Sequence, residues 1–342
     1  MAKNWWKILG IALLLYSSVA TFLVPLDPGI LAVENGQVKP GLNEVTVVGY
    51  NTHFESEAGS MQTFIQSEDV RICGSIVEII SPTKAKMSFD IPANLPLSLA
   101  DLYLNNDHDG TIYLPNALSV SGTDKSAPIP TNCDITVKTN AIDHFGFPFL
   151  PTIFETIRNL IFHVPMWFTM FFIMIVSFSQ SILFLSKGKT IYDTRAEQAV
   201  IVGLVFCILG LVTGSIWARF TWGAWWLNDP QLNGAMATFL IYAAYMVLRK
   251  SIPEENKRGR IAAVYNIFAF VMLVVLLMIL PKFTESLHPG KGGTPAFSSY
   301  DLDSSLRLVF YPAVIGWIIV GYWMYKIRLR YVQLLRKVDY DE

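Results

Sequence analysis

The sequence contains little charge. Only 15% of its 342 residues are Asp, Glu, Lys or Arg, whereas soluble domains contain about 25%. The net charge of −1 provides no positive excess to attract a nucleic acid. The phosphate-binding pattern GxxxxGK is absent, so any use of ATP has to come from a partner. These shortages argue against an ordinary soluble protein, a nucleic-acid-binding protein and a nucleotide-hydrolysing enzyme.

Cysteine is scarce as well, with three residues in the whole chain. Cys207 lies within an apolar run, where it is expected to pack as a small side chain. Cys73 and Cys133 fall in the polar part of the chain. They are compatible with a disulfide in an oxidising compartment and equally with two buried apolar residues.

The polar part of the chain lacks a recognisable active site. Asp107-His108-Asp109 has the composition of a metal-loop fragment, but no further ligands follow at a usable spacing. We therefore interpret it as a solvated turn. His53 and His144 have no companions in the sequence either. No catalytic residue is predicted anywhere in the chain.

The sequence contains six long apolar runs without charged residues. They occupy residues 8–24, 164–186, 199–218, 232–248, 261–280 and 308–325. Each has roughly the 17–25 residues that a helix needs to span the hydrocarbon core of a membrane. The sequence therefore predicts an all-α polytopic membrane protein with six transmembrane helices.

A β-rich extracytoplasmic domain is predicted between helices 1 and 2. Polar residues occur throughout this part, and short β-prone runs alternate with Gly, Asn and Asp turns, as in a small sandwich or barrel. The expected strands are Val45–Tyr50, Gly74–Ile80, Lys86–Ile91 and Asp134–Lys138. The predicted domains are a first transmembrane helix (1–25), the β-rich domain (26–150), a five-helix membrane domain (151–330) with a Trp-rich loop (219–232), and a cytoplasmic tail (331–342).

Basic residues predict the orientation in the membrane. With the N-terminus in the cytoplasm, every internal segment carries several Lys or Arg residues, as the positive-inside rule requires. The short loops on the opposite side hold only Arg219, Lys282, Lys291 and Arg307. Both termini are therefore expected inside. The first apolar run is expected to remain as a helix, although Ser18-Val-Ala20 also fits a signal-peptide cleavage site.

The most unusual segment is Trp222-Gly-Ala-Trp-Trp-Leu-Asn-Asp229, which lies between the third and fourth apolar runs. Indole side chains are common anchors at a membrane interface. Three of them beside the small Gly223 and Ala224 also suit a platform for a flat, apolar ligand. Spacing alone does not separate these two interpretations.

Two histidines favour the ligand platform. His163 lies at the outer mouth of the second apolar run, and His288 lies in the outer loop after the fifth. A single interfacial His usually makes only hydrogen bonds, but two imidazoles can ligate a haem iron from both faces. Two histidines on the side of the Trp-rich loop therefore indicate a haem site.

Four motifs occur in register with the six apolar runs. They are His163-Val-Pro165, Thr213-Gly-Ser-Ile-Trp217, Trp222-Gly-Ala-Trp-Trp226 with Asp229, and Leu287-His-Pro-Gly290. In this order they resemble the CcmC branch of the haem-handling proteins of cytochrome c maturation, whose tryptophan-rich loop is called the WWD motif. The resemblance covers about residues 155–330. The chain departs from it at Asn228, where the family usually has Trp, and in its long external insert.

The resemblance implies a protein that binds haem b at the outer face of the bacterial inner membrane and delivers it to a periplasmic haem chaperone. It implies His163 and His288 as axial iron ligands. The remaining haem contacts would come from the Trp-rich loop: Trp222, Gly223, Trp225, Trp226, Asn228 and Asp229. We expect Asp229 mainly to cap the following helix, with Pro230 in its first turn.

The partners implied by the resemblance are a CcmE-like haem chaperone, a CcmA/CcmB ABC transporter and a small CcmD-like subunit. One alternative is a haem lyase of the CcsA type, which usually has more spans and additional inner histidines. Another is a transporter or channel, but such proteins usually carry ionisable or helix-breaking residues at mid-membrane. Here Pro312 and Gly316 are the chief exceptions to an apolar interior.

Overall fold

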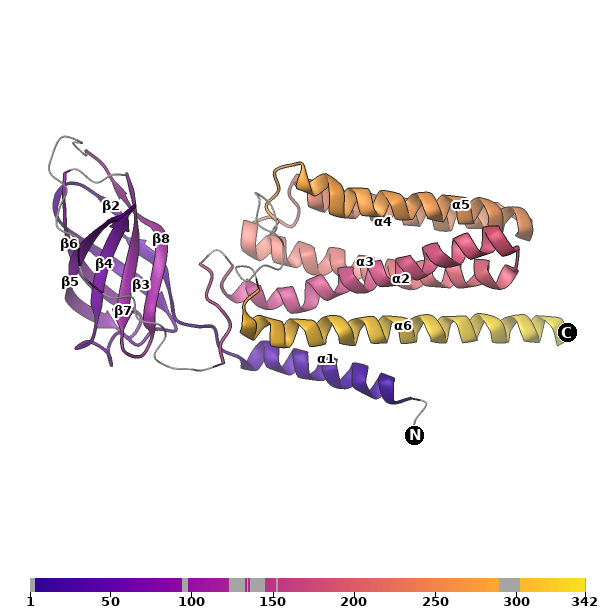
Figure 1. Ribbon diagram of the computed structural model, residues 1–342, viewed down its shortest axis with the longest axis horizontal. Helices are drawn as coiled ribbons and strands as arrows, with labels where there is room; N and C mark the ends of the chain where they lie inside the picture. Colours follow the sequence, from indigo (N-terminus) through magenta and orange to yellow (C-terminus); the bar gives the residue numbers. More distant parts are fainter. Residues whose placement is uncertain are drawn as a thin grey trace. The chain divides into compact units, whose positions relative to one another are not determined.

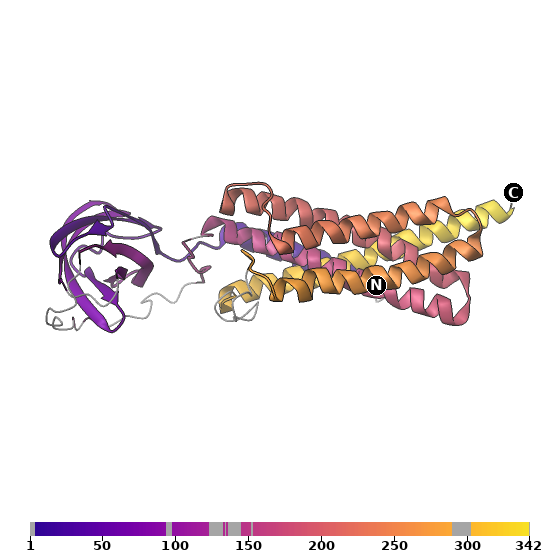
Figure 2. The same cartoon turned by 90° about the horizontal axis from the view of Figure 1, so that it is seen from above.

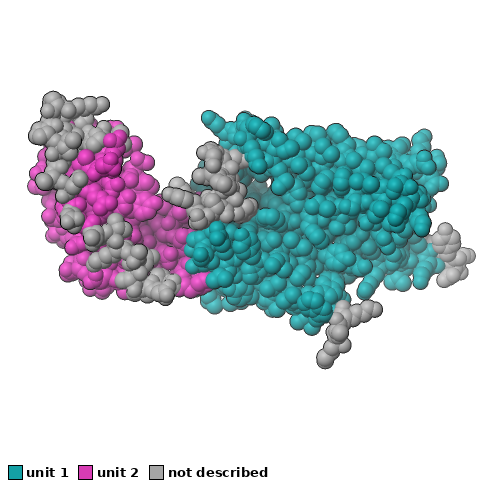
Figure 3. Space-filling model, in the orientation of Figure 1, with its two compact units in different colours: residues 1–23, 156–342 teal, residues 24–155 magenta. Residues whose placement is uncertain are grey.

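The structure is a computed structural model that describes residues 4–93, 98–122, 133, 135, 145–151, 153–288 and 302–341. The chain folds into two compact units. One unit comprises Met1–Leu23 with Thr156–Glu342, and the other comprises Val24–Glu155 (Figure 3).

Six long helices form the first unit and run side by side (Figures 1 and 2). They are α1 (Trp5–Leu23), α2 (Leu160–Lys187), α3 (Thr190–Trp222), α4 (Pro230–Ser251), α5 (Glu255–Val274) and α6 (Ser304–Asp341). A π-helical turn (Val275–Ile279) and a 3-10 turn (Leu280–Lys282) extend α5. All six helices are long and apolar enough to cross a membrane. The predicted fold class is confirmed, and the protein is a multi-pass membrane protein.

Consecutive helices alternate in direction, which brings functional segments to one end of the bundle (Figure 1). The end of α1, the start of α2, the end of α3 and the start of α4 all lie there, with the segment after α5 and the start of α6. We call it the Trp end, because it contains Trp222. α6 continues helically through residues 331–341, so the segment that we expected as a tail is a helical extension of the sixth span.

Close packing between α1 and α6 depends on two glycines. A Cβ atom added to Gly10 would lie 2.6 Å from the side chain of Ile319, and one added to Gly316 would lie 2.9 Å from Leu14. Small residues let membrane helices approach closely, where dispersion contacts replace the hydrophobic effect as the source of association. Gly316 therefore serves helix packing.

A buried ion pair ties α3 to α4. The Arg249 guanidinium donates to both carboxylate oxygens of Asp193, at 2.6 and 2.8 Å, and to Glu197 at 3.1 Å. Only 4% of the Arg249 side chain is exposed. Asp193 lies in the first turn of α3, which begins after Lys189, and its carboxylate faces Arg249 of α4.

The second unit contains an eight-stranded sheet. Its strands are β1 (Gly29–Glu34), β2 (Gln37–Val38), β3 (Gly41–Tyr50), β4 (Gln62–Ser67), β5 (Val70–Ser81), β6 (Lys84–Ile91), β7 (Leu99–Asn106) and β8 (Gly110–Val120). The order is β1-β3-β6-β5-β4-β7-β8-β2, antiparallel except for the short β2–β8 pair. The sheet curls into a half-barrel (Figure 2) around an apolar core that includes Phe54, Ile65, Met87 and Leu104.

Three of the expected strands form parts of β3, β5 and β6. The fourth, Asp134–Lys138, lies outside the described residues except for Ile135. Cys73 on β5 is disulfide-bonded to Cys133. The disulfide decides between the two alternatives that the sequence left open for these cysteines.

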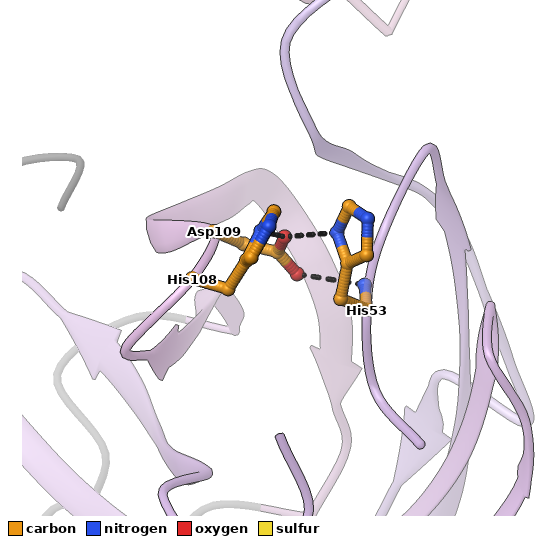
Figure 4. Close-up of side chains that lie close together, drawn as sticks. All are labelled: His53, His108 and Asp109. Atoms are coloured by element: carbon orange, nitrogen blue, oxygen red, sulfur yellow. Dashed lines mark hydrogen bonds and ion pairs between the residues drawn. The ribbon is translucent and has the colours of Figure 1, made fainter. Parts of the chain in front are cut away.

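The turn between β7 and β8 corrects a sequence interpretation. Asp109 is buried, with 2% of its surface exposed, so it does not belong to a solvated turn. Its carboxylate lies 2.8 Å from Nδ1 of His53 and 3.2 Å from Nδ1 of His108 (Figure 4). His53 therefore has two companions that sequence spacing did not reveal. His144 lies outside the described residues.

We predict that Arg249→Met destabilises the helical unit by about 3–5 kcal/mol, because it leaves the Asp193 carboxylate buried without its counter-charge. Unfolding in detergent, followed by circular dichroism, measures the loss. The matched control is Lys250→Met, since Lys250 is the exposed neighbour on the same helix. Adding Asp193→Leu to Arg249→Met should recover much of the stability. Equal losses in Arg249→Met and Lys250→Met would contradict the prediction.

Candidate functional site

Asp229 organises the start of α4. Its side chain accepts hydrogen bonds from the backbone N–H groups of Gln231 (2.8 Å) and Leu232 (3.3 Å), and Pro230 occupies the first helical turn. These bonds satisfy N–H groups that have no partner within the helix. The predicted capping role of Asp229 is confirmed.

The same carboxylate also holds the segment after α5. Its second oxygen accepts the backbone N–H of Leu287 at 2.9 Å, and its first oxygen lies 3.3 Å from Nδ1 of His288. Burial alone would raise the pKa of Asp229, but hydrogen bonds from Leu287 and Ser286, together with nearby His288, hold it below its ordinary value. Asp229 is therefore an anion at neutral pH, and it joins two connections of the Trp end.

His288 lies against Trp222, with ring centroids 5.3 Å apart and the planes at 65°. Nδ1 is the ring nitrogen close to Asp229, in ion-pair contact but without hydrogen-bond geometry, so Nε2 lies on the side away from the carboxylate. A carboxylate on one nitrogen commonly orients an imidazole that ligates a metal through the other. The geometry of His288 thus suits a metal ligand.

His163 lies in the first turns of α2 and contacts α3. Its Nδ1 is 3.1 Å from the hydroxyl of Thr213, which itself donates to the carbonyl of Leu209 at 2.8 Å. The hydroxyl therefore accepts from Nδ1, which leaves Nε2 as the acceptor. Nε2 receives the indole N–H of Trp167 at 3.3 Å, and the edge of Trp217 lies against the ring at a centroid distance of 5.7 Å.

Gly214 makes room for this imidazole. A Cβ atom at Gly214 would lie 2.7 Å from Cε1 of His163, closer than such atoms pack. Thr213, Gly214 and Trp217 of α3 all contact the His163 imidazole. The structural role of the Thr213-Gly-Ser-Ile-Trp217 run is therefore to position this side chain. Sequence reasoning assigned no role to Trp167. The signal was its i, i+4 spacing from His163, which places both side chains on one helix face.

The remainder of the Trp-rich loop is open to the surroundings. Trp225 is 58% exposed and Trp226 is 37% exposed. Trp226 donates to the side-chain carbonyl of Asn233 at 3.3 Å, and the amide of Asn233 donates to Asn228 at 2.8 Å. Asn228 thus fixes the loop to α4.

Gly223 ends α3 with φ of +81°, a backbone conformation that glycine adopts without strain. Its carbonyl accepts a hydrogen bond from Arg219. The chain can therefore turn sharply after Trp222 toward the two exposed indoles. This local geometry explains a glycine in the second position of the loop.

The structure brings the two predicted histidines to the same end of the bundle. His288 is grouped with Trp222 and Asp229, and His163 is grouped with Trp167 and Trp217. The Trp end therefore offers two imidazoles with tryptophan rings beside each of them.

Comparison with known proteins identifies relatives of the helical unit. The family model described as heme exporter protein C (CcmC) matches residues 146–342. The chain is 26% identical to heme exporter protein C of Paracoccus denitrificans over 135 residues, which are 40% of this chain and 56% of that protein. It is 30% identical to heme exporter protein C of Bradyrhizobium diazoefficiens over 122 residues, 35% of this chain and 46% of that protein.

The chain also resembles cytochrome c biogenesis protein CcsA of Prochlorococcus marinus, at 36% identity over 83 residues. That match covers 24% of this chain and 26% of the CcsA protein. The chain thus spans between a quarter and about half of the length of these relatives. Because the family model matches more than half of the chain, this protein belongs to the heme exporter protein C family.

Proposed function

We propose that this protein binds haem at the Trp end and delivers it to a haem chaperone during cytochrome c biogenesis. The observation that carries the proposal is the arrangement of His288, beside Asp229 and against Trp222, at the same end of the bundle as His163. The names of the relatives, heme exporter protein C and cytochrome c biogenesis protein CcsA, support it independently.

The donor set suits an iron porphyrin. Imidazole nitrogens are common axial ligands of haem iron, and flat indole rings provide apolar surface for the macrocycle. The Asp229 carboxylate lies 3.3 Å from Nδ1 of His288, within reach of the contact that typically orients a ligating imidazole. In this proposal His163 and His288 ligate the iron of haem b, and Trp222, Trp225 and Trp226 contact the ring. Gly223, Asn228 and Asp229 shape the loop that presents it.

The exposed indoles support transfer rather than permanent storage. Trp225 is 58% exposed, and Trp226, which is bonded to Asn233 of α4, is 37% exposed. A flat ligand resting on them would keep an edge accessible to another protein. The receiving protein would be a CcmE-like chaperone, and CcmA/CcmB with a CcmD-like subunit would complete the assembly.

The proposed location is the bacterial inner membrane, with both termini in the cytoplasm and the Trp end facing the periplasm. The distribution of basic residues supports this orientation. Residues 151–330 would then form the haem-handling domain. Residues 26–150 would lie in the periplasm, where the Cys73–Cys133 disulfide is stable.

We predict that His163→Ala and His288→Ala each lower haem affinity at least about tenfold, because the loss of an outer-shell partner alone costs roughly 10–100-fold in metal affinity. The absorption spectrum of protein purified from haem-replete cells measures haem occupancy. Both variants should elute and melt as the wild type does. A correctly folded wild type without a haem spectrum would refute the proposal itself.

Trp225→Ala and Trp226→Ala should lower haem affinity about two- to twelvefold, the value of an aromatic contact of about 0.5–1.5 kcal/mol. Because both side chains are exposed, the melting temperature should hardly change. Trp317→Ala is the comparison, since Trp317 packs against Phe206 within the helical core. It should lower stability and leave haem affinity near the wild-type value. Equal losses of haem in all three variants would indicate general destabilisation.

A third prediction concerns Trp167, whose indole N–H occupies Nε2 of His163. Iron can use this nitrogen only after the N–H has left it. Trp167→Phe keeps an aromatic ring beside Gly210 but removes the donor. Since a hydrogen bond contributes about 1 kcal/mol net, haem affinity should rise about fivefold. Titration of haem-free protein with haemin measures it, and an unchanged or lower affinity would show that the indole does not compete.

The second candidate function is that of a CcsA-type haem lyase, which the match to the Prochlorococcus protein supports. Reconstitution separates the two. Haem-loaded protein is mixed with either a CcmE-like chaperone or an apocytochrome, and covalent haem is read on denaturing gels. Haem on the chaperone alone supports delivery, and haem on the apocytochrome alone supports the lyase.

A further inference from the structure

We propose that the β-rich unit contains a binding site for one divalent transition-metal ion, formed by Nδ1 of His53, Nδ1 of His108 and Oδ1 of Asp109 (Figure 4). The site is separate from the haem ligands proposed above and does not depend on them. Its preferred occupants are Zn²⁺ and ions of similar chemistry.

Two segments that are distant in the sequence supply the ligands. His53 lies in the connection between β3 and β4, and His108 and Asp109 form the turn between β7 and β8. The three potential ligand atoms lie within 4.8 Å of one another. The imidazole centroids are 3.9 Å apart. Both imidazoles therefore converge on Oδ1 of Asp109, an arrangement that closing a surface turn does not require.

The two oxygens of the buried Asp109 carboxylate have different partners. Oδ2 of Asp109 accepts the backbone N–H of His53 and the side-chain amide of Asn106, both at 2.9 Å. Oδ1 is approached by the two imidazoles. Neutral donors therefore fix Oδ2. Oδ1 is shared between two Nδ1 atoms, each of which can bind a metal ion when the proton of its imidazole resides on Nε2.

The spacing already matches a coordination sphere. Oδ1 lies 2.8 Å from Nδ1 of His53 and 3.2 Å from Nδ1 of His108. Ligands at 2.0–2.1 Å from one zinc ion are separated by roughly 2.9–3.3 Å at angles between square and tetrahedral. An ion can thus be accommodated by a small outward displacement of the rings. Their side chains are 41% and 39% exposed, so solvent reaches the site and can supply a fourth ligand.

The ligand types select the metal. Two imidazoles and one carboxylate favour Zn²⁺, Cu²⁺ or Ni²⁺, whereas Ca²⁺ and Mg²⁺ prefer oxygen ligands alone. One carboxylate and a divalent ion leave the centre with a single positive charge.

The surrounding backbone holds the ligands in place. Phe54 is fully buried in the core of the sheet, and its N–H donates to the carbonyl of Pro82 at 2.9 Å. That anchor fixes His53 beside it. The side-chain oxygen of Asn106 accepts the N–H groups of His108 (3.0 Å) and Asp109 (2.6 Å), which closes the turn. A site built on rigid supports of this kind binds metal without refolding.

The test uses the full-length protein in detergent, in a His163→Ala/His288→Ala background that removes the other pair of imidazoles. Titration with Co²⁺, followed by its visible absorption bands, should give one equivalent per chain, and Zn²⁺ should displace it. His53→Gln and His108→Gln should each lower Co²⁺ affinity at least about tenfold. Added Zn²⁺ should raise the melting temperature of the background protein. It should not raise that of the variant with both His53→Gln and His108→Gln, the double Gln variant.

Asp107→Asn is the matched control, because it removes an acid from the same turn without removing a ligand, and it should bind Co²⁺ like the background protein. X-ray absorption of the zinc-loaded background protein should show imidazole ligands at about 2.0–2.1 Å, a measurement that needs no ligand variant to fold. No Co²⁺ binding beyond that of the double Gln variant, an equal loss in Asp107→Asn, or a zinc shell without imidazole would each overturn the proposal.

Discussion

The hydrocarbon core of the membrane imposes the constraint on which the helical unit depends. Backbone polar groups inside it have to be satisfied within the segment, so the chain crosses only as helices. Polar chemistry is then confined largely to the helix ends. Because successive helices alternate in direction, the start of α2, the end of α3, the start of α4 and the segment after α5 meet at one end. His163, Trp222, Asp229 and His288 lie on these four segments.

Within that end, Asp229 is the residue through which the parts are joined. It satisfies the first N–H groups of α4, accepts the N–H of Leu287 and faces His288. The orientation of one imidazole is thereby coupled to the position at which a membrane helix begins. His163 is supported differently, by Thr213 and Gly214 of α3. The two imidazoles consequently have independent supports.

Much of this could be predicted from the sequence, and the reasons are local. Six uncharged runs of sufficient length fix the spans, and Asp229 before Pro230 has the pattern of a helix cap. The resemblance to the CcmC family came from short motifs at helix ends, and the family model confirms it. The Trp167–His163 contact was also readable, since i, i+4 neighbours share a helix face, but an apolar context made Trp167 resemble an ordinary core residue.

Other features depend on strand register, which the sequence states only weakly. His53 and Asp109 are 56 positions apart in the sequence. They meet because the β3–β4 connection and the β7–β8 turn lie at the same end of the curled sheet. No spacing rule covers such a pair. The Cys73–Cys133 disulfide likewise joins residues 60 positions apart, a separation that no spacing rule covers. Arg249 shows a further limit, since an Arg at the end of a span is normally a topology signal and here it also forms a buried ion pair.

The length of α6 has a mechanical consequence. Its 38 residues rise about 57 Å at about 1.5 Å per residue, whereas the hydrocarbon core is about 30 Å thick. Even a strongly tilted span leaves several turns outside the apolar layer, and those turns carry Lys326, Arg328 and Arg330. This part of α6 is a stiff basic surface that also contacts α3, where Arg328 donates to Gln198 at 3.1 Å. A protein bound to it lies about a bilayer thickness away from Trp222.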